Sequence, residues 1–205
     1  HFDSGANRDP RAWVLGANSR LPADVSVAWA RAVPPGFDAR FSATGRVYRY
    51  AILNRSARSA LLDGRVTWDH RPLEVERMCE AAAPLLGRHD FSSFRAGGCQ
   101  AKSPVRTLRR FDIWRSGDLV LLEVEADAFL QHMVRNLAGV LAAIGAGQQP
   151  TDWAAEVLAR RDRTAGGVTA PPDGLYLIRV LYPAQYDLPV PVAGNLIGGL
   201  PPGAA

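Results

Sequence analysis

Arginine and tyrosine side chains alternate along residues 39–50, which read Ala-Arg-Phe-Ser-Ala-Thr-Gly-Arg-Val-Tyr-Arg-Tyr. The period of two predicts a strand, on which Arg46, Tyr48 and Tyr50 share one side. Guanidinium groups neutralise phosphates and a phenol ring can stack on an unpaired base, so this surface suits RNA. The alternative is a strand whose aromatic rings pack into a core while its arginines are merely solvated.

Arg135 is a second candidate, because it lies near the expected start of a helix, where a cation opposes the helix dipole. It falls beside the apolar stripe of that helix, on a flank where Ala138, Gly139 and Ala142 leave room for something to approach. A buried carboxylate or an RNA phosphate would explain an arginine in this place. An ordinary solvated arginine is equally compatible with the sequence.

A polar loop, residues 95–106, carries Lys102 and Arg106 among glycines and small residues. Its amides and cations could follow a phosphate backbone. It could equally be a mobile connection without a ligand.

Other kinds of chemistry lack a signature in this chain. There is no G-x-S-x-G, no glycine-rich phosphate loop and no cluster of metal ligands, and the four histidines are scattered. Cys79 and Cys99 stand apart without C-x-x-C spacing, as ordinary intracellular thiols do. The sequence therefore predicts neither a metal site nor a disulfide framework.

Charge and hydropathy favour a globular protein with a local basic patch. The 205 residues carry a formal charge of only +4, and 47% of them are hydrophobic. The stretch from Arg40 to Arg65, both ends included, contains six arginines and a single acid, Asp63. The longest apolar run, residues 137–147, is too short to cross a bilayer, and no secretory signal opens the chain. We expect a cytoplasmic protein without a membrane segment.

Further elements are predicted from local pattern. We expect helices from Pro10 to near Gly16, over 72–86, 133–144 and 151–160, and strands over 25–33, 105–114, 119–126 and 175–182. Ser116-Gly117-Asp118 reads as a tight hairpin turn between two of these strands. Mixed elements without strict alternation predict the α+β class with a mainly antiparallel sheet.

Five blocks of sequence, taken in order, resemble the tRNA pseudouridine synthase A family. They are Ala39–Ala43 running into Tyr48–Tyr50, Leu86–Arg95, Phe129–Asn136, Thr169–Leu177 and Tyr182-Pro183. The resemblance implies the pseudouridine synthase fold, with two ferredoxin-like or RRM-like lobes around a basic cleft. Residues 1–70 would be what remains of the N-terminal lobe, 71–189 the C-terminal lobe and 190–205 a proline- and glycine-rich tail.

The resemblance also implies an activity, a partner and residue roles. The family isomerises uridines at positions 38 to 40 of the tRNA anticodon stem-loop without a cofactor, as a homodimer, on a base extruded from its stack. By the resemblance, Tyr48 stacks on the uracil and helps to remove a proton, Arg135 pairs with the catalytic aspartate, and Leu175 packs against the base. We expect further tRNA contacts from Arg40, Phe41, Arg46, Lys102 and Arg106.

The catalytic aspartate of the family lies in a motif like G-R-T-D-x-G-V-H, which the resemblance places ahead of His1. Neither Asp3, Asp90 nor Asp127 has that context. We therefore expect these residues alone to be inactive and the intact product to be active. The alternatives are a tRNA-binding module without chemistry, or an α+β domain unrelated to RNA whose basic strand is incidental.

Overall fold

A computed structural model describes residues 1–190, 197 and 199, so most of the tail expected at 190–205 lies outside the described residues. The chain divides into two compact units, residues 1–43 with 182–189, and residues 44–181 with the described residues beyond 189. The boundary expected near residue 70 falls inside the second unit, whose sheet contains strands from both sides of it. The division of the intact protein into two lobes stays a prediction.

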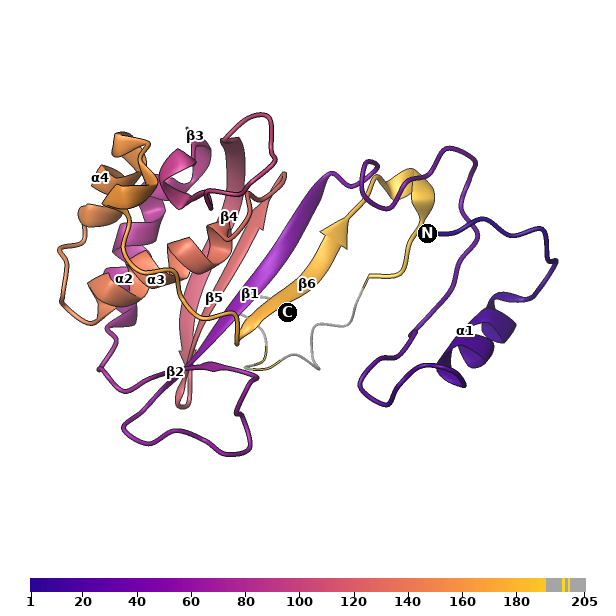
Figure 1. Ribbon diagram of the computed structural model, residues 1–205, viewed down its shortest axis with the longest axis horizontal. Helices are drawn as coiled ribbons and strands as arrows, with labels where there is room; N and C mark the ends of the chain where they lie inside the picture. Colours follow the sequence, from indigo (N-terminus) through magenta and orange to yellow (C-terminus); the bar gives the residue numbers. More distant parts are fainter. Residues whose placement is uncertain (191–196, 198, 200–205) are drawn as a thin grey trace. The chain divides into compact units, whose positions relative to one another are not determined.

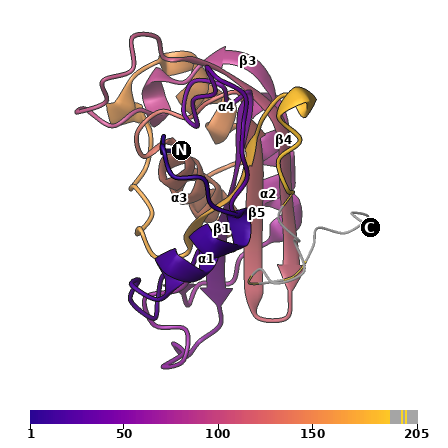
Figure 2. The ribbon, with the colours of Figure 1, turned by 90° about the vertical axis from the view of Figure 1, so that its right-hand side faces the viewer.

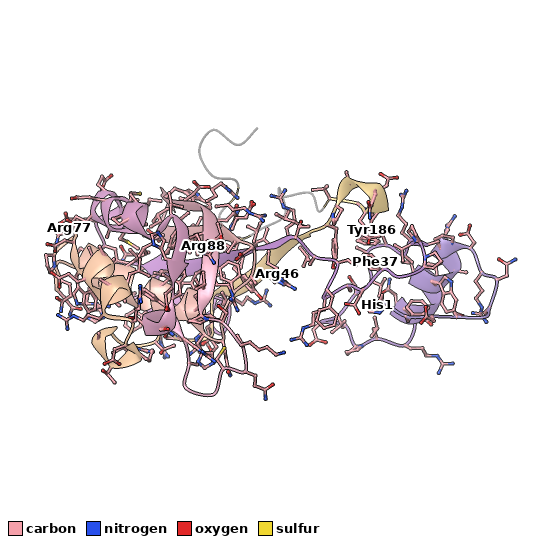
Figure 3. The ribbon with its side chains drawn as sticks, turned by 90° about the horizontal axis from the view of Figure 1, so that it is seen from above. His1, Phe37, Arg46, Arg77, Arg88 and Tyr186 are labelled. Carbon is pink, nitrogen blue, oxygen red and sulfur yellow. The ribbon has the colours of Figure 1, made fainter. Side chains whose placement is uncertain are left out.

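The first unit contains a single α-helix, α1 (Pro10–Asn18). Its N-cap is Asp9, whose Oδ1 accepts a hydrogen bond from the Arg11 N–H at 2.8 Å, and Pro10 occupies the first helical position. Elsewhere the unit is held by aromatic contacts, in which the Phe37 ring packs against His1, Tyr182 and Tyr186 (Figure 3). The strand expected over 25–33 is wrong, because none of these residues belongs to a helix or a strand in the structure.

The second unit is a six-stranded sheet covered on one face by helices (Figure 1). The strands are β1 (Gly45–Asn54), β2 (Thr67–Asp69), β3 (Gly87–Asp90), β4 (Val105–Ser116), β5 (Leu119–Ala126) and β6 (Leu175–Leu181). They follow the order β2-β1-β5-β4-β3, with β6 also paired to β1. Among the strand pairs that the structure describes, β1–β2 is the only parallel one. The predicted α+β class and mainly antiparallel sheet are confirmed.

The helices of this unit are α2 (Val75–Ala82), α3 (Met133–Gly145) and α4 (Trp153–Arg160), with 3-10 turns at 83–85, 92–94 and 163–165. Their buried side chains join those of one sheet face in a large apolar core. The helix expected over 72–86 is shorter than predicted. Residues 87–90, which follow this helix, form β3 and pair in register with β4.

The hairpin β4–β5 is the element that sequence located best. Its two strands run side by side in Figure 2 and pair from Ser116 opposite Leu119 to Leu108 opposite Ala126. Gly117 takes φ +57° in the turn, a conformation that favours glycine. No helix among the described residues is long and apolar enough to span a membrane.

Candidate active site

The alternation along β1 sends its side chains to two different environments. Tyr50 is fully buried in the core beneath the helices, whereas Tyr48, two residues earlier on the same face, is half-buried against the edge of that core. The Tyr48 ring meets Phe129 edge-on, with centroids 5.0 Å apart. Tyr50 thus fits the alternative in which the aromatic rings of the strand pack into a core. Of the two β1 tyrosines, Tyr48 is the one that stays partly accessible.

The Tyr50 hydroxyl joins three segments of the unit. It donates to the Pro171 carbonyl at 2.8 Å and forms a short hydrogen bond with the Thr67 hydroxyl. Burial raises the pKa of Tyr50 to about 12, against smaller lowering contributions from Thr67 and from the positive charge of Arg135. Tyr50 therefore stays neutral at physiological pH and acts as a structural link between β1, β2 and residues near Pro171.

Arg49, on the opposite face of β1, is a structural residue that the sequence reading did not separate from its neighbours. Its side chain is only 1% exposed and pairs with Glu123 of β5, Nη2 to Oε2 at 2.7 Å. Its guanidinium also lies over the Trp114 ring, 5.0 Å from the centroid. Because its guanidinium is buried and paired inside the protein, Arg49 does not belong to an RNA-facing surface.

Arg135 lies in the first turn of α3 and is bound to Ala170 twice. Its Nε donates to the Ala170 carbonyl at 2.7 Å, and the Ala170 N–H donates to the Arg135 carbonyl at 3.2 Å. Its Nη1 and Nη2 atoms have no hydrogen-bond or ion-pair partner among the described residues. One edge of the guanidinium is thus anchored, while the other keeps a pair of parallel donors.

The structure brings Tyr48, Leu175 and Arg135 to one face of the sheet. Helix α3 contacts β1, and the Arg135 charge is near enough to act on Tyr50. Leu175 of β6 is paired in register with Tyr50 and packs against the same core. These three residues were predicted to meet around a base, and their catalytic and binding roles stay predictions.

The flank of α3 that the sequence left open is occupied by the chain itself. A Cβ built on Gly139 would lie 2.0 Å from the Val168 carbonyl oxygen. Residues 168–170 therefore pass directly over this flank, which explains the small residue at 139. Sequence reasoning found the space beside Arg135 and missed that residues 168–170 fill it.

The loop 95–106 is tied to itself. Arg95 Nη2 donates to the carbonyls of Cys99 and Ala101, at 2.6 and 2.8 Å, and Arg106 Nη1 donates to those of Ser103 and Val105. Lys102 is exposed and has no side-chain partner in the described part of the chain. Of the two cations predicted to bind RNA in this loop, Arg106 already donates hydrogen bonds to nearby backbone carbonyls.

Arg46 is half-buried on β1, labelled in Figure 3. Arg40 and Phe41 belong to the other unit, where Asp38 Oδ1 accepts both of their N–H groups at 2.7 and 2.8 Å. These hydrogen bonds lower the pKa of Asp38, and the one from the Phe41 N–H has the largest effect. The Phe41 side chain is 81% exposed, with the Arg40 guanidinium over its ring.

Asp90 and Asp127, which do not lie in the family's aspartate motif, have local structural roles. Asp90 accepts from the N–H and hydroxyl of Ser92, and Asp127 accepts from the N–H groups of Thr107 and Ala128. Among the described residues, no group of three His, Cys, Asp or Glu side chains is placed to hold a metal ion.

Comparisons with known proteins agree with the blocks found in the sequence. Residues 81–183 match the family model described as tRNA pseudouridine synthase. Over 202 residues the chain is 56% identical to tRNA pseudouridine synthase A of Pseudomonas aeruginosa, covering 98% of the chain and 71% of that protein. It is also 55% identical over 188 residues to the protein of the same name from Methylococcus capsulatus, covering 92% and 69%. For that of Nitrosococcus oceani the identity is 56% over 189 residues, covering 92% and 73%.

Proposed function

This chain belongs to the tRNA pseudouridine synthase A family, and we propose that it modifies uridines at positions 38 to 40 of the tRNA anticodon stem-loop. The family activity makes it an isomerase that converts uridine in tRNA to pseudouridine. The bond from N1 of the base to the sugar breaks, the uracil turns, and C5 bonds to the sugar while its proton leaves and N1 gains one. Atoms and electrons balance within the nucleotide, so the reaction requires no redox partner.

The arrangement of Arg135 carries the proposal for the site. A carboxylate accepts two parallel N–H bonds from a guanidinium, and Arg135 keeps such an edge while Nε is fixed to Ala170. In the proposed site this edge holds the catalytic aspartate ionised and oriented. Tyr48, on the same sheet face, stacks on the extruded uracil and takes part in removing the C5 proton, and Leu175 packs against the base.

Cationic and aromatic residues outside this centre would make further contacts with the tRNA. We assign that role to Arg40, Phe41, Arg46, Lys102 and Arg106, supported by the exposure of Phe41 and Lys102. Phosphate contacts make affinity fall steeply with salt. An α+β domain unrelated to RNA would show little tRNA binding at physiological salt, and that measurement separates the two.

The carboxylate itself is proposed to come from the family's G-R-T-D-x-G-V-H motif, which these 205 residues do not contain. We propose that residues 1–205 alone do not turn over uridine. The test joins a family segment bearing the motif ahead of His1, a protein called here the aspartate-bearing form. Carbon-linked uridine should accumulate in tRNA with this form and not with residues 1–205 alone. A form that binds tRNA without making product would favour the non-catalytic tRNA-binding module.

Residue roles are tested in the same form. Arg135→Lys keeps the charge and loses the paired donors, so kcat should fall by about 100-fold or more. Arg160→Lys is the matched control, because Arg160 is exposed on α4 and its kcat should stay near that of the parent. Tyr48→Phe keeps stacking and loses the hydroxyl; unchanged turnover would exclude proton transfer by Tyr48.

Assembly and substrate position complete the proposal. We propose a homodimer in the cytoplasm, to be tested by the mass of the protein in solution. Substrate tRNAs with cytidine at 38, 39 or 40 in turn would show which uridines are used. Modification that persists when all three are replaced would contradict the assigned positions.

A further inference from the structure

Three consecutive residues of the segment after α4 meet three residues of α3. Val168 lies over Gly139, Thr169 bonds Asn136, and Ala170 bonds Arg135. Position 139 lies four residues from 135 and three from 136, so it is a same-face neighbour of both, and the three positions fall within about 100° around the helix. The carbonyl that anchors Arg135 is therefore delivered by a segment packed along the same helix.

Asn136 fixes the middle of this contact. It is 3% exposed, and its Nδ2 donates to the Phe94 carbonyl at 2.7 Å, which leaves Oδ1 facing the segment. The Thr169 hydroxyl donates to that Oδ1 at 2.7 Å. A buried amide with both ends bonded has a single orientation, so it provides a rigid reference on α3.

Arg163 closes the network from the start of the segment. Its Nη2 donates to Thr169 Oγ1 at 2.7 Å and to Asn136 Oδ1 at 3.2 Å. Its Nη1 donates to the carbonyls of Gly166 and Gly167 at 3.3 and 3.2 Å. One planar side chain thus ties the turn at 166–167, Thr169 and α3 together, which the single ammonium of a lysine could not reproduce.

We propose that Arg163 is a positioning residue for Arg135, acting through Thr169 and the Ala170 carbonyl; this rests on the role proposed for Arg135. A long arginine side chain is flexible, and among the described residues the Arg135 guanidinium is held only through Nε. The position of the Ala170 oxygen therefore sets where the free edge points. A displacement of about 1 Å in a reacting group can cost about 100-fold in rate.

The decisive experiment is a double-mutant cycle in the aspartate-bearing form, assayed well below its unfolding temperature. Arg163→Lys should lower kcat by about 10-fold or more and leave KM for tRNA within about two-fold. In an Arg135→Lys background, the same change should cost less than about three-fold, because its effect passes through the missing guanidinium. A merely structural role for Arg163 predicts equal losses in both backgrounds, and that result would overturn the proposal.

Thr169 gives an independent check if Arg163→Lys folds poorly. Thr169→Ser keeps the hydroxyl and should retain the kcat of the parent. Thr169→Val keeps the shape but lacks the hydroxyl, so its kcat should fall. Equal activity of the two variants would contradict the network. The parent and the Arg160→Lys protein serve as references. If neither makes pseudouridine, the proposed function is wrong. If every Arg163 and Thr169 variant keeps full activity, only the positioning role of Arg163 is wrong.

Discussion

Replacing Gly139 by alanine should separate stability from activity, because α3 contains two glycines with different surroundings. The new Cβ at 139 would meet a backbone atom, the Val168 carbonyl oxygen, at 2.0 Å. At Gly145, near the other end of α3, it would meet the Cγ and Sδ atoms of Met78 at 2.8 Å. Both changes crowd the core, yet only the first presses on the segment that anchors Arg135.

The size of the effect follows from these distances. An ordinary C···O contact is about 3.3 Å or longer, so the 2.0 Å approach requires residues 168–170 to move by more than about 1 Å. Such a shift takes the Thr169–Asn136 bond of 2.7 Å out of hydrogen-bond range. Overpacking and the lost bonds cost about 2–4 kcal/mol together, offset by about 1 kcal/mol of helix propensity. We expect a net loss of roughly 1–3 kcal/mol in unfolding free energy and a fall in kcat of up to about 100-fold.

The assay pairs urea unfolding with single-substrate kinetics on the aspartate-bearing form. Gly145→Ala should lose about 0–2 kcal/mol, because overpacking against the side chain of the buried Met78 is offset by the same gain in helix propensity, and its kcat should stay within about two-fold of the parent. Its site is ten residues from Arg135, about 15 Å along the helix. If Gly139→Ala keeps the parent kcat, or if the two variants lose activity in step with stability, the reasoning about residues 168–170 is refuted.

Two further predictions concern stability alone. Glu123→Gln leaves the Arg49 charge buried without its carboxylate and should lower the free energy of urea unfolding by about 3 kcal/mol or more. The control is Glu125→Gln, because Glu125 contacts its two arginines at 3.8 and 4.0 Å, and it should cost less than about 1 kcal/mol. Equal losses in the two variants would contradict the assignment of the buried pair. The second concerns pH: Tyr50 has a folded pKa of about 12 and an unfolded value of 10.0, so its neutral form stabilises the fold fully below pH 10 and this contribution is lost as pH rises through 12. The loss is roughly 2–3 kcal/mol, measured as unfolding free energy between pH 9 and 12, and parallel profiles for the parent and Tyr50→Phe would refute it.

Local pattern predicted the elements that carry a strong period. The alternation around Tyr48 and Tyr50 became β1, the apolar stripe from Met133 became α3, and the turn at Gly117 joined β4 to β5. The same kind of alternation over 25–33 did not become a strand. A strand needs a partner edge as well as a pattern, and the period of a segment does not reveal whether another strand lies beside it.

The residue types of the site were also legible in the sequence. The arginine near the start of a helix, the small residues on its flank and the tyrosine on a basic strand all identified positions that the fold brings to one face. Order and spacing of the five blocks identified the family, which the comparisons confirm.

Tertiary structure alone decided which groups are engaged. It placed Arg49 in a buried pair with Glu123, seventy-four residues away, and Arg163 in contact with Asn136, twenty-seven residues away. It also showed that the open flank of α3 receives the segment ending at Ala170. Such pairings depend on how the chain folds back on itself. Periodicity reports only which neighbours share a face, so no local pattern could have assigned the partner of any of these arginines.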